Sequence, residues 1–249
     1  MDKAASLGII DWGIGGIGIY KRIRQRSGLP IVYLSDTGAT PYGKMSRNEL
    51  SGRLDTVIAY LESCGAASIL IGCNAASTAI NDLKQHNLPV RGVIEPAVEM
   101  AEWEQPSSLG LIGGRRTVVS GVYRRAFAAR GIDVRQRIAQ PLSALIESGD
   151  TSSGLLIRTA ESILAPLKDC SHILLACTHY PAISRVIADI VSPTTRLLDP
   201  AEYIARSVPM DKAGTGRDVF LTTGDPDAMR VAAANAFDVK VTAIQKVSI

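Results

Sequence analysis

Residues 172–181 constrain the fold of this chain more than any other segment. They read HILLACTHYP, a short apolar run that ends in a cysteine, two polar residues, an aromatic residue and a proline. A short apolar run closed by a turn signal is typical of a buried parallel strand, and α/β sheets bind ligands at the carboxyl ends of such strands. We therefore expect Cys177, Thr178 and His179 to lie at a strand end.

A second segment has the same form. Residues 68–77 read SILIGCNAAS, again an apolar run that delivers a cysteine, Cys73, and small polar neighbours to a strand end. Two strands of this kind predict one site with two thiols.

The pattern also recurs along the chain. Residues 108–112 (SLGLI) repeat residues 6–10 (SLGII), and Cys177 repeats Cys73 at nearly the same spacing. Recurrence of strand starts and strand ends at one spacing indicates a duplicated unit. The predicted fold class is therefore α/β, with two similar three-layer domains of mostly parallel sheets. We expect a pseudo-twofold relation between them and the active site in the cleft, where the two cysteines face one ligand.

Composition excludes several classes of protein. The 249 residues are 46% hydrophobic and 20% charged, an ordinary balance for a globular chain. The net charge of +3 is too small to indicate a nucleic-acid partner. No apolar run approaches the roughly 18 residues of a membrane span, so no membrane partner is expected.

The four cysteines are expected to be reduced thiols in the cytoplasm. The N-terminus lacks the long apolar core of a signal peptide, and disulfides are rare in the cytosol. The spacings of Cys64, Cys73, Cys170 and Cys177 do not fit zinc-binding pairs, so we expect no metal site. Cys64 and Cys170 are expected to be buried or half-buried packing residues.

The remaining segments predict alternating strands and helices. We expect strands at residues 31–36, 90–94, 218–222 and 239–243. We expect helices at residues 47–63 and 97–103, and one that runs from just after Cys73 to about residue 85.

The first strand leads into a glycine-rich turn that allows an alternative function. Gly13, Gly15 and Gly18 follow Asp11 in a GxGxxG pattern, and Asp36 ends the next strand. These are features of a dinucleotide-binding fingerprint, so an oxidoreductase that binds a nicotinamide cofactor is one alternative. Against it, Asp11 would put negative charge close to a bound pyrophosphate. The glycines would equally let a helix N-terminus approach another anion, such as a carboxylate.

Two opposed thiols suit the inversion of a carbon stereocentre. Inversion removes a proton from one face of the carbon and returns one on the other, which two fixed bases of opposite protonation achieve. A thiol, with an ordinary pKa of about 8.5, serves as base or acid after modest tuning. His179 and Asp11 are the candidates for this tuning.

Seven segments, spread over nearly the whole chain, form a set of motifs: residues 9–16 (IIDWGIGG), 36–43 (DTGATPYG), 73–77 (CNAAS), 110–123 (GLIGGRRTVVSGVY), 145–147 (LIE), 177–181 (CTHYP) and 222–226 (TTGDP). Together they resemble the glutamate racemases of the aspartate/glutamate racemase superfamily. The segment 177–181 matches the pattern of that family without change.

The resemblance implies an amino-acid racemase that needs no cofactor and interconverts L- and D-glutamate or a related amino acid. It implies catalysis by Cys73 and Cys177, assisted by Asp11 and His179. The partner would be a small molecule, the amino-acid substrate, held by Trp12, Pro41, Tyr42, Gly43, Asn74, Ala75, Thr117, Glu147 and Thr178. Because the C-terminal segment of that family returns to the first domain, residues 1–96 and 207–249 would form one domain and residues 97–206 the other. Family members often form dimers, so a homodimer is a further expectation.

Three positions depart from the family pattern. Trp12 stands where a serine is usual, Ala75 where a threonine is usual, and Gly114 where a threonine is common. An indole in place of a hydroxyl should shrink the pocket, and each lost hydrogen bond should cost roughly 0.5–1.5 kcal/mol. A different amino acid as substrate, a related decarboxylase and a catalytically retired binding homologue therefore stay open, as does the metabolic pathway.

Overall fold

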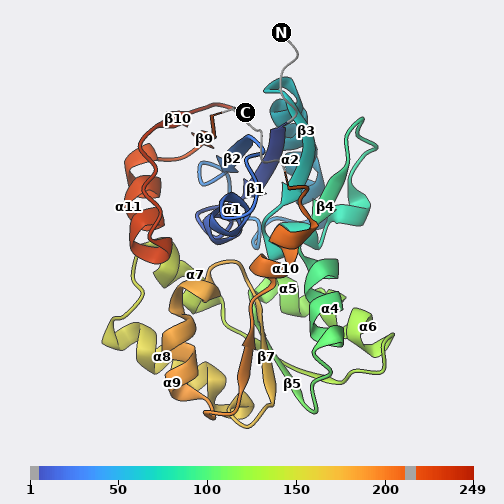
Figure 1. The fold of residues 1–249 in the computed structure, drawn as a ribbon, viewed down its shortest axis with the longest axis vertical. Helices are drawn as coiled ribbons and strands as arrows, with labels where there is room; N and C mark the ends of the chain where they lie inside the picture. The colour runs from blue at the N-terminus through green and yellow to red at the C-terminus, as the bar shows by residue number, and fades with distance from the viewer. Residues whose placement is uncertain (1–5, 211–216) are drawn as a thin grey trace.

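The computed structural model describes residues 6–210 and 217–249, which form two α/β halves, one above the other in Figure 1. Residues 1–5, part of the N-terminus in which no signal peptide was expected, lie outside the described residues. The first half contains β1 (Ser6–Asp11), α1 (Ile17–Arg24), β2 (Ile31–Ser35), α2 (Arg47–Ser63), β3 (Ala66–Ile71), α3 (Asn74–Ser77), a 3-10 turn (Ile80–Asp82) and β4 (Val90–Gly92), and near the C-terminus β9 (Val219–Thr222), α11 (Pro226–Phe237) and β10 (Ile244–Lys246).

The second half and its connections are built from the middle of the chain. They comprise α4 (Ile94–Trp103), β5 (Leu109–Gly113), α5 (Arg115–Val119), α6 (Val122–Ala128), β6 (Val134–Ile138), α7 (Gln140–Glu147), α8 (Gly154–Leu164), a 3-10 turn (Ala165–Leu167), β7 (His172–Ala176), a 3-10 turn (Tyr180–Ile183), α9 (Ser184–Ile190), β8 (Arg196–Leu198) and α10 (Pro200–Ser207).

The described strands form two sheets, and every strand pair in them is parallel. The first sheet has the order β10-β9-β2-β1-β3-β4, and the second has the order β6-β5-β7-β8. Four consecutive strands of each half therefore follow the same order, in which β1 corresponds to β5 and β3 to β7. This agreement confirms the predicted α/β fold with two similar units.

The strand order determines where a ligand site should lie. In each half the chain leaves the first strand towards one edge of the sheet and later continues towards the other edge. The switch falls between β1 and β3 in one half and between β5 and β7 in the other, and crevices form at the carboxyl ends of strands at such points. Cys177 directly follows β7, and Cys73 follows β3 after one glycine, Gly72.

An apolar core that runs through both halves holds them together. One continuous cluster includes Ile14 and Ile17 from the first half with Leu142, Ile146 and Tyr180 from the second, all buried. Two smaller clusters lie within single halves, one under α2 and one between α4, α6 and the second sheet.

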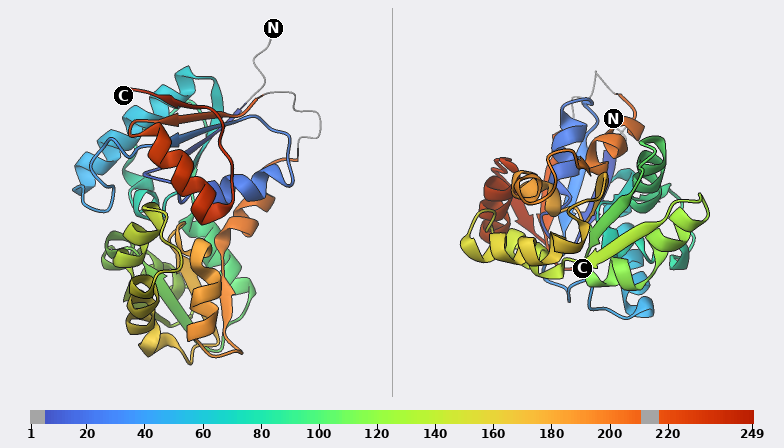
Figure 2. Two further views of the ribbon diagram at one scale, coloured as in Figure 1. Left: turned by 90° about the vertical axis from the view of Figure 1, so that its left-hand side faces the viewer. Right: turned by 90° about the horizontal axis from the view of Figure 1, so that it is seen from below.

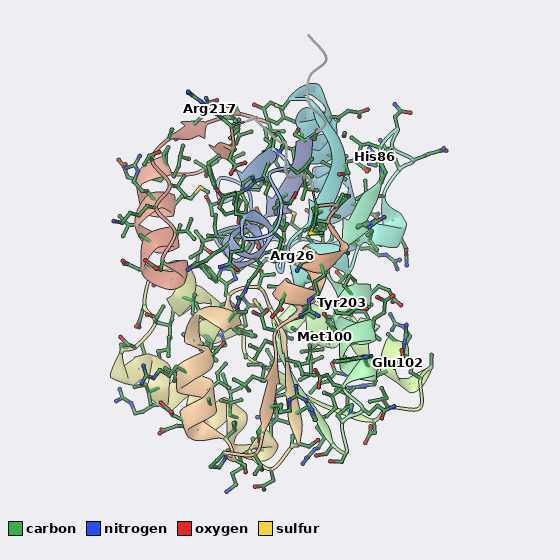
Figure 3. All side chains as sticks on the ribbon, viewed as in Figure 1. Arg26, His86, Met100, Glu102, Tyr203 and Arg217 are labelled. Carbon is green, nitrogen blue, oxygen red and sulfur yellow. The ribbon has the colours of Figure 1, made fainter. Side chains whose placement is uncertain are left out.

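Helices α10 and α11 also connect the halves, since α11 contacts α1 in the first half and α7 in the second. Helix α10 packs against both α1 and α4, and the Tyr203 hydroxyl donates a hydrogen bond to Glu99 on α4. Figure 3 labels Tyr203 and Met100 at this junction. Figure 2 shows that α11 lies on the half formed by the N-terminal strands, where β9 and β10 extend the first sheet.

Helix α2 illustrates how local sequence sets an element. It begins after Ser46, whose hydroxyl accepts from the Glu49 backbone while the Glu49 carboxylate accepts from the Ser46 backbone. This reciprocal cap satisfies two of the unpaired N–H groups at the helix start. The buried residues of the helix recur at the spacing of one apolar helical face, namely Leu50, Leu54, Val57, Ile58 and Leu61.

The expected helix from Cys73 to about residue 85 is wrong. Only α3 and a short 3-10 turn form there. The following loop instead docks on α2, because the Asp55 carboxylate accepts from the Lys84 backbone at 3.1 Å and contacts His86 at 2.9 Å. These long-range contacts replace the helical hydrogen bonds of residues 83–86.

Three other sequence predictions need correction. The last strand lies at Ile244–Lys246 rather than at residues 239–243, because α11 ends at Phe237 and Val241 is then buried in the core. Helix α4 begins at Ile94, so the expected strand at residues 90–94 is limited to Val90–Gly92. Cys64 is exposed, because it lies at the C-terminal cap of α2, whereas Cys170 is buried as expected.

Among the described residues, no helix is both long enough and apolar enough to span a membrane. The proposed domain boundaries at residues 96 and 207 remain a prediction.

Candidate active site

A cavity of about 500 Å³ lies between the two halves, where the carboxyl ends of β1, β3, β5 and β7 meet. This volume is within the usual range of small-molecule sites, roughly 300–1,000 Å³. Every residue that the sequence predicted for the site lines it: Asp11, Trp12, Pro41, Tyr42, Gly43, Cys73, Asn74, Ala75, Thr117, Glu147, Cys177, Thr178 and His179.

Six lining residues were not predicted: Lys44, Gly114, Arg115, Gln140, Ser143 and Ala144. Three of them lie on α7 with Glu147, at positions that share one helical face. The helical spacing back from Glu147 is the signal that would have found them. Lys44 directly follows Gly43, and Arg115 directly follows Gly114. Neither shows a sequence pattern that would have predicted it for the site.

Cys177 belongs to a chain of polar contacts within the second half. Its sulfur lies 3.6 Å from Nδ1 of His179, and Nε2 of His179 lies 2.6 Å from Oε2 of Glu147. The Ser143 hydroxyl lies 3.4 Å from the same sulfur. Burial alone lowers the pKa of His179, but its hydrogen bonds to Cys177 and Glu147 outweigh burial and raise that pKa well above the ordinary value. These contacts therefore favour the positively charged form of His179 beside Cys177.

Cys73 lies in a different environment. It is buried and caps the short helix α3. Burial raises its pKa well above the ordinary value, the negative charge of Asp11 raises it further, and backbone N–H groups of Ala76 and Trp12 oppose the shift. Cys73 is therefore a thiol over the neutral pH range.

Asp11 connects the two halves at the base of the cavity. It is fully buried and accepts hydrogen bonds from the Gly13 backbone at 3.2 Å and from the Thr178 hydroxyl at 3.0 Å. Burial raises its pKa, while the nearby charge of His179 opposes the shift. Thr178 comes from the second half, so Asp11 joins the ends of β1 and β7.

The glycine-rich turn is explained by the approach of the second half. A Cβ at Gly13 would overlap the Glu147 carboxylate, and one at Gly15 would overlap the Thr178 hydroxyl. The Ile14 backbone N–H donates to Oε2 of Glu147 at 3.0 Å. These glycines therefore let side chains of the second half reach the backbone after β1, and the carboxylate that approaches this helix start belongs to the protein.

The loop after β2 is held by Asp36. This buried carboxylate receives a paired contact from Arg53, with N–O distances of 2.8 and 2.5 Å, and hydrogen bonds from Tyr42 and Thr223 at 2.8 Å each. Charge-assisted bonds of this kind are strong and directional. Asp36 thus fixes Tyr42, and with it the backbone of Gly43, at the cavity wall.

Asn74 and Trp12 are positioned by single contacts. The Tyr123 hydroxyl of the second half donates to Oδ1 of Asn74 at 2.7 Å. The Trp12 indole N–H donates to the backbone carbonyl of Ala39 at 3.1 Å. Trp12 and Ala75 pack against the apolar cluster under α2, so this part of the wall is apolar where the family pattern has two hydroxyls.

Within residues 6–210 and 217–249, no group of three or more His, Cys, Asp or Glu side chains is arranged to hold a metal ion.

Comparison with known proteins identifies relatives along the whole chain. Residues 19–208 match the family described as Asp/Glu/Hydantoin racemase. A glutamate racemase of Thermus thermophilus is 34% identical over 264 aligned residues, covering 100% of this chain and 98% of the relative.

Solved structures agree. The crystal structure of glutamate racemase from Thermus thermophilus in complex with β-chloro-D-alanine aligns with a TM-score of 0.86 at 30% identity, covering 100% of this chain and 99% of that chain. A glutamate racemase from Bacillus anthracis aligns with a TM-score of 0.89 at 22% identity, covering 99% and 98%, and shows the shared fold.

Proposed function

Because this chain belongs to the Asp/Glu/Hydantoin racemase family and is therefore an isomerase that racemises amino acids, we propose that it acts through two cysteines. Cys73 and Cys177 would work on opposite faces of Cα, and glutamate would be the substrate. The observation that carries the proposal is the presence of both thiols in one cavity, one from each half.

Proton transfer follows from the unequal surroundings of the thiols. For one enantiomer, the Cys177 sulfur takes the Cα proton while the Cys73 thiol gives its own proton to the other face. The product leaves a protonated Cys177 and a deprotonated Cys73, which is the state required for the reverse reaction. The positive charge of His179 beside Cys177 favours the first arrangement, and the burial of Cys73 near Asp11 keeps its proton in place until transfer.

The carbanion formed in this step is a high-energy species and needs stabilisation by fixed dipoles and charges. We propose that Asn74, Thr117, Thr178 and the backbone at Tyr42 and Gly43 hold the substrate's amino and carboxylate groups. Asp11, whose pKa is raised by burial, would assist Cys73, as His179 would assist Cys177. The contacts that Tyr42 makes to Asp36 and Asn74 to Tyr123 support this role, because they pre-orient the groups that would bind the substrate.

A different amino acid is the alternative substrate. Trp12 and Ala75 make one wall of the cavity apolar, which removes two hydroxyls that would contact polar groups of glutamate. An amino acid with a less polar side chain would lose less by binding there.

The test is α-hydrogen exchange in D₂O, without added cofactor, on both enantiomers of a panel of amino acids, read by mass and chirality. The expected result is exchange with inversion of glutamate. Inversion of another amino acid alone would replace glutamate as substrate. No exchange on any candidate by folded, reduced protein would overturn the racemase mechanism in favour of a retired homologue or a decarboxylase.

The oligomeric state is a separate proposal. A homodimer, as in many family members, would be tested by sedimentation velocity, where a single monomeric species at micromolar concentration would contradict it.

A further inference from the structure

A second hollow lies beside the active-site cavity and has a different character. Its volume is about 450 Å³, and it shares Gly43 and Arg115 with the cavity. Its walls come from both halves, because Arg47 and Thr78 belong to the first and Arg115, Arg116 and Arg125 to the second. Helix α5, which carries two of these arginines, lies at the junction of the halves in Figure 1.

Four guanidinium groups surround this hollow, and their charge is poorly balanced. Arg47 forms an ion pair with Asp82 at 2.5 Å. Across the described parts of the chain, no ion pair joins Arg115, Arg116 or Arg125 to an acidic side chain. Three positive charges therefore line a concave surface without an ion pair, and Asp82, which already pairs with Arg47, is the acidic group that acts on Arg116.

Arg116 is held in place by neutral groups. Its guanidinium donates to the Met45 carbonyl at 2.6 Å and to the Thr78 hydroxyl at 3.1 Å, both in the first half. Burial lowers the pKa of Arg116, and the nearby charge of Arg47 adds to that effect while Asp82 opposes it. The protein thus uses hydrogen bonds to fix a cation close to other cations.

We propose that this hollow binds a small anion that carries two or more phosphate oxyanion groups, such as a diphosphate. Guanidinium groups match phosphate oxygens in geometry and form strong paired hydrogen bonds with them. Three cations without an ion pair suit a multiply charged ligand better than a single carboxylate. The ligand would bridge the two halves at the edge of the active site, whichever amino acid the cavity accepts.

The direct test is isothermal titration of the full chain with pyrophosphate at constant ionic strength, without divalent metal. We expect saturable binding to the wild type. Arg125→Gln and Arg47→Gln should each weaken binding about tenfold, since each removes a charged hydrogen-bond donor. Arg124→Gln is the matched control, because this exposed neighbour on α6 does not line the hollow and should leave binding unchanged.

Two further arms locate the site and identify the ligand class. Cys177→Ala changes only the active-site side and should leave pyrophosphate binding unchanged, so a loss there would place the anion in the active-site cavity and overturn the proposal. Equal binding of citrate would overturn the phosphate assignment. Equal pyrophosphate binding by Arg125→Gln and Arg124→Gln would also overturn the proposal, provided that thermal melting shows both variants to be folded. Because binding is read directly, these outcomes are independent of whether the chain racemises glutamate.

Discussion

The two cysteines occupy corresponding positions at the ends of β3 and β7, yet their surroundings are opposite in charge. Cys177 lies next to a histidine that is held by a glutamate, and its sulfur is half-buried. Cys73 is buried, and after burial the largest contribution to its raised pKa is the negative charge of Asp11. The duplicated fold places the two thiols at equivalent positions, but the residues around each thiol give it a different electrostatic environment.

This difference suits a reaction that needs one proton acceptor and one proton donor at the same time. Two identical environments would leave both thiols in the same protonation state at a given pH. Part of the asymmetry comes from different residues at equivalent places. Asp11 ends the first strand of the first unit where the second unit has Gly113, and His179 stands two residues after Cys177 where the first unit has Ala75.

Removal of each thiol tests the comparison with the largest expected effect. Cys73→Ala and Cys177→Ala should each reduce racemisation by about 10²–10⁴-fold, the usual contribution of a positioned acid or base. Each variant should still exchange the α-hydrogen of one enantiomer with D₂O, without inversion, and the two variants should act on opposite enantiomers. Mass spectrometry and chiral chromatography measure both. Exchange of the same enantiomer by both variants would show that the thiols do not serve opposite faces.

Glu147→Gln should weaken the Cys177 side selectively. The amide keeps an acceptor for the Ile14 backbone but loses the charge that raises the pKa of His179. We expect kcat to fall by roughly tenfold, within the range for one charged hydrogen bond. The pH at which activity declines on the alkaline side should also move downwards, because His179 would lose its proton earlier.

Glu161→Gln, on the exposed surface of α8, is the matched control and should behave as wild type. An unchanged pH profile in Glu147→Gln would mean that this carboxylate does not act through His179.

Substitutions in the apolar wall near Cys73 should change activity less than the loss of a thiol or of the Glu147 charge. Combined Trp12→Ser and Ala75→Thr substitutions should lower KM for glutamate by roughly 2- to 10-fold per restored hydrogen bond. Steady-state kinetics with both enantiomers checks this. If the folded double variant shows no gain on glutamate, the wall is not what sets substrate preference.

The smallest effect concerns stability at high pH. The pKa of Cys73 is raised in the folded protein above the unfolded value of about 8.5. Above that pH the unfolded chain binds fewer protons than the native one, so the free energy of unfolding falls as pH rises towards the folded pKa. Cys73→Ser should reduce this fall by at most about 1.4 kcal/mol per pH unit.

Urea denaturation of wild type and Cys73→Ser at pH 7 and pH 9.5 measures the difference. Other groups with raised pKa values, such as Cys170, contribute equally to both proteins and cancel. If the free energy of unfolding falls equally in both proteins between pH 7 and pH 9.5, Cys73 ionises in the folded protein as it does in the unfolded chain.

The positions of the central strands could be predicted from the sequence, because the formation of a strand depends largely on the local pattern of apolar and turn residues. Short apolar runs followed by turn residues located β1, β3, β5 and β7, and parallel strands bring their carboxyl ends to one edge. That is why Asp11, Cys73, Cys177, Thr178 and His179 line one cavity. The other residues of the predicted site followed from the resemblance to the racemase family and not from strand pattern. The recurrence of the two cysteine segments likewise indicated the repeat that both sheets share.

Local pattern failed where distant contacts decide the backbone. The loop after α3 is shaped by Asp55 of α2, and the last strand begins only where it meets β9. The GxGxxG turn resembled a dinucleotide site because glycine permits the close approach of many kinds of group. The sequence alone does not show that the Glu147 carboxylate is the group that packs against this turn.

Only the tertiary structure determined how the two thiols differ. The contact of Glu147 with both His179 and the Ile14 backbone joins residues far apart in the chain, as does the contact of Thr178 with Asp11. The sequence determined which groups reach the site, because strand ends are set locally. Their charges and protonation depend on burial and on partners within a few ångströms, and these exist only once the two halves have packed together.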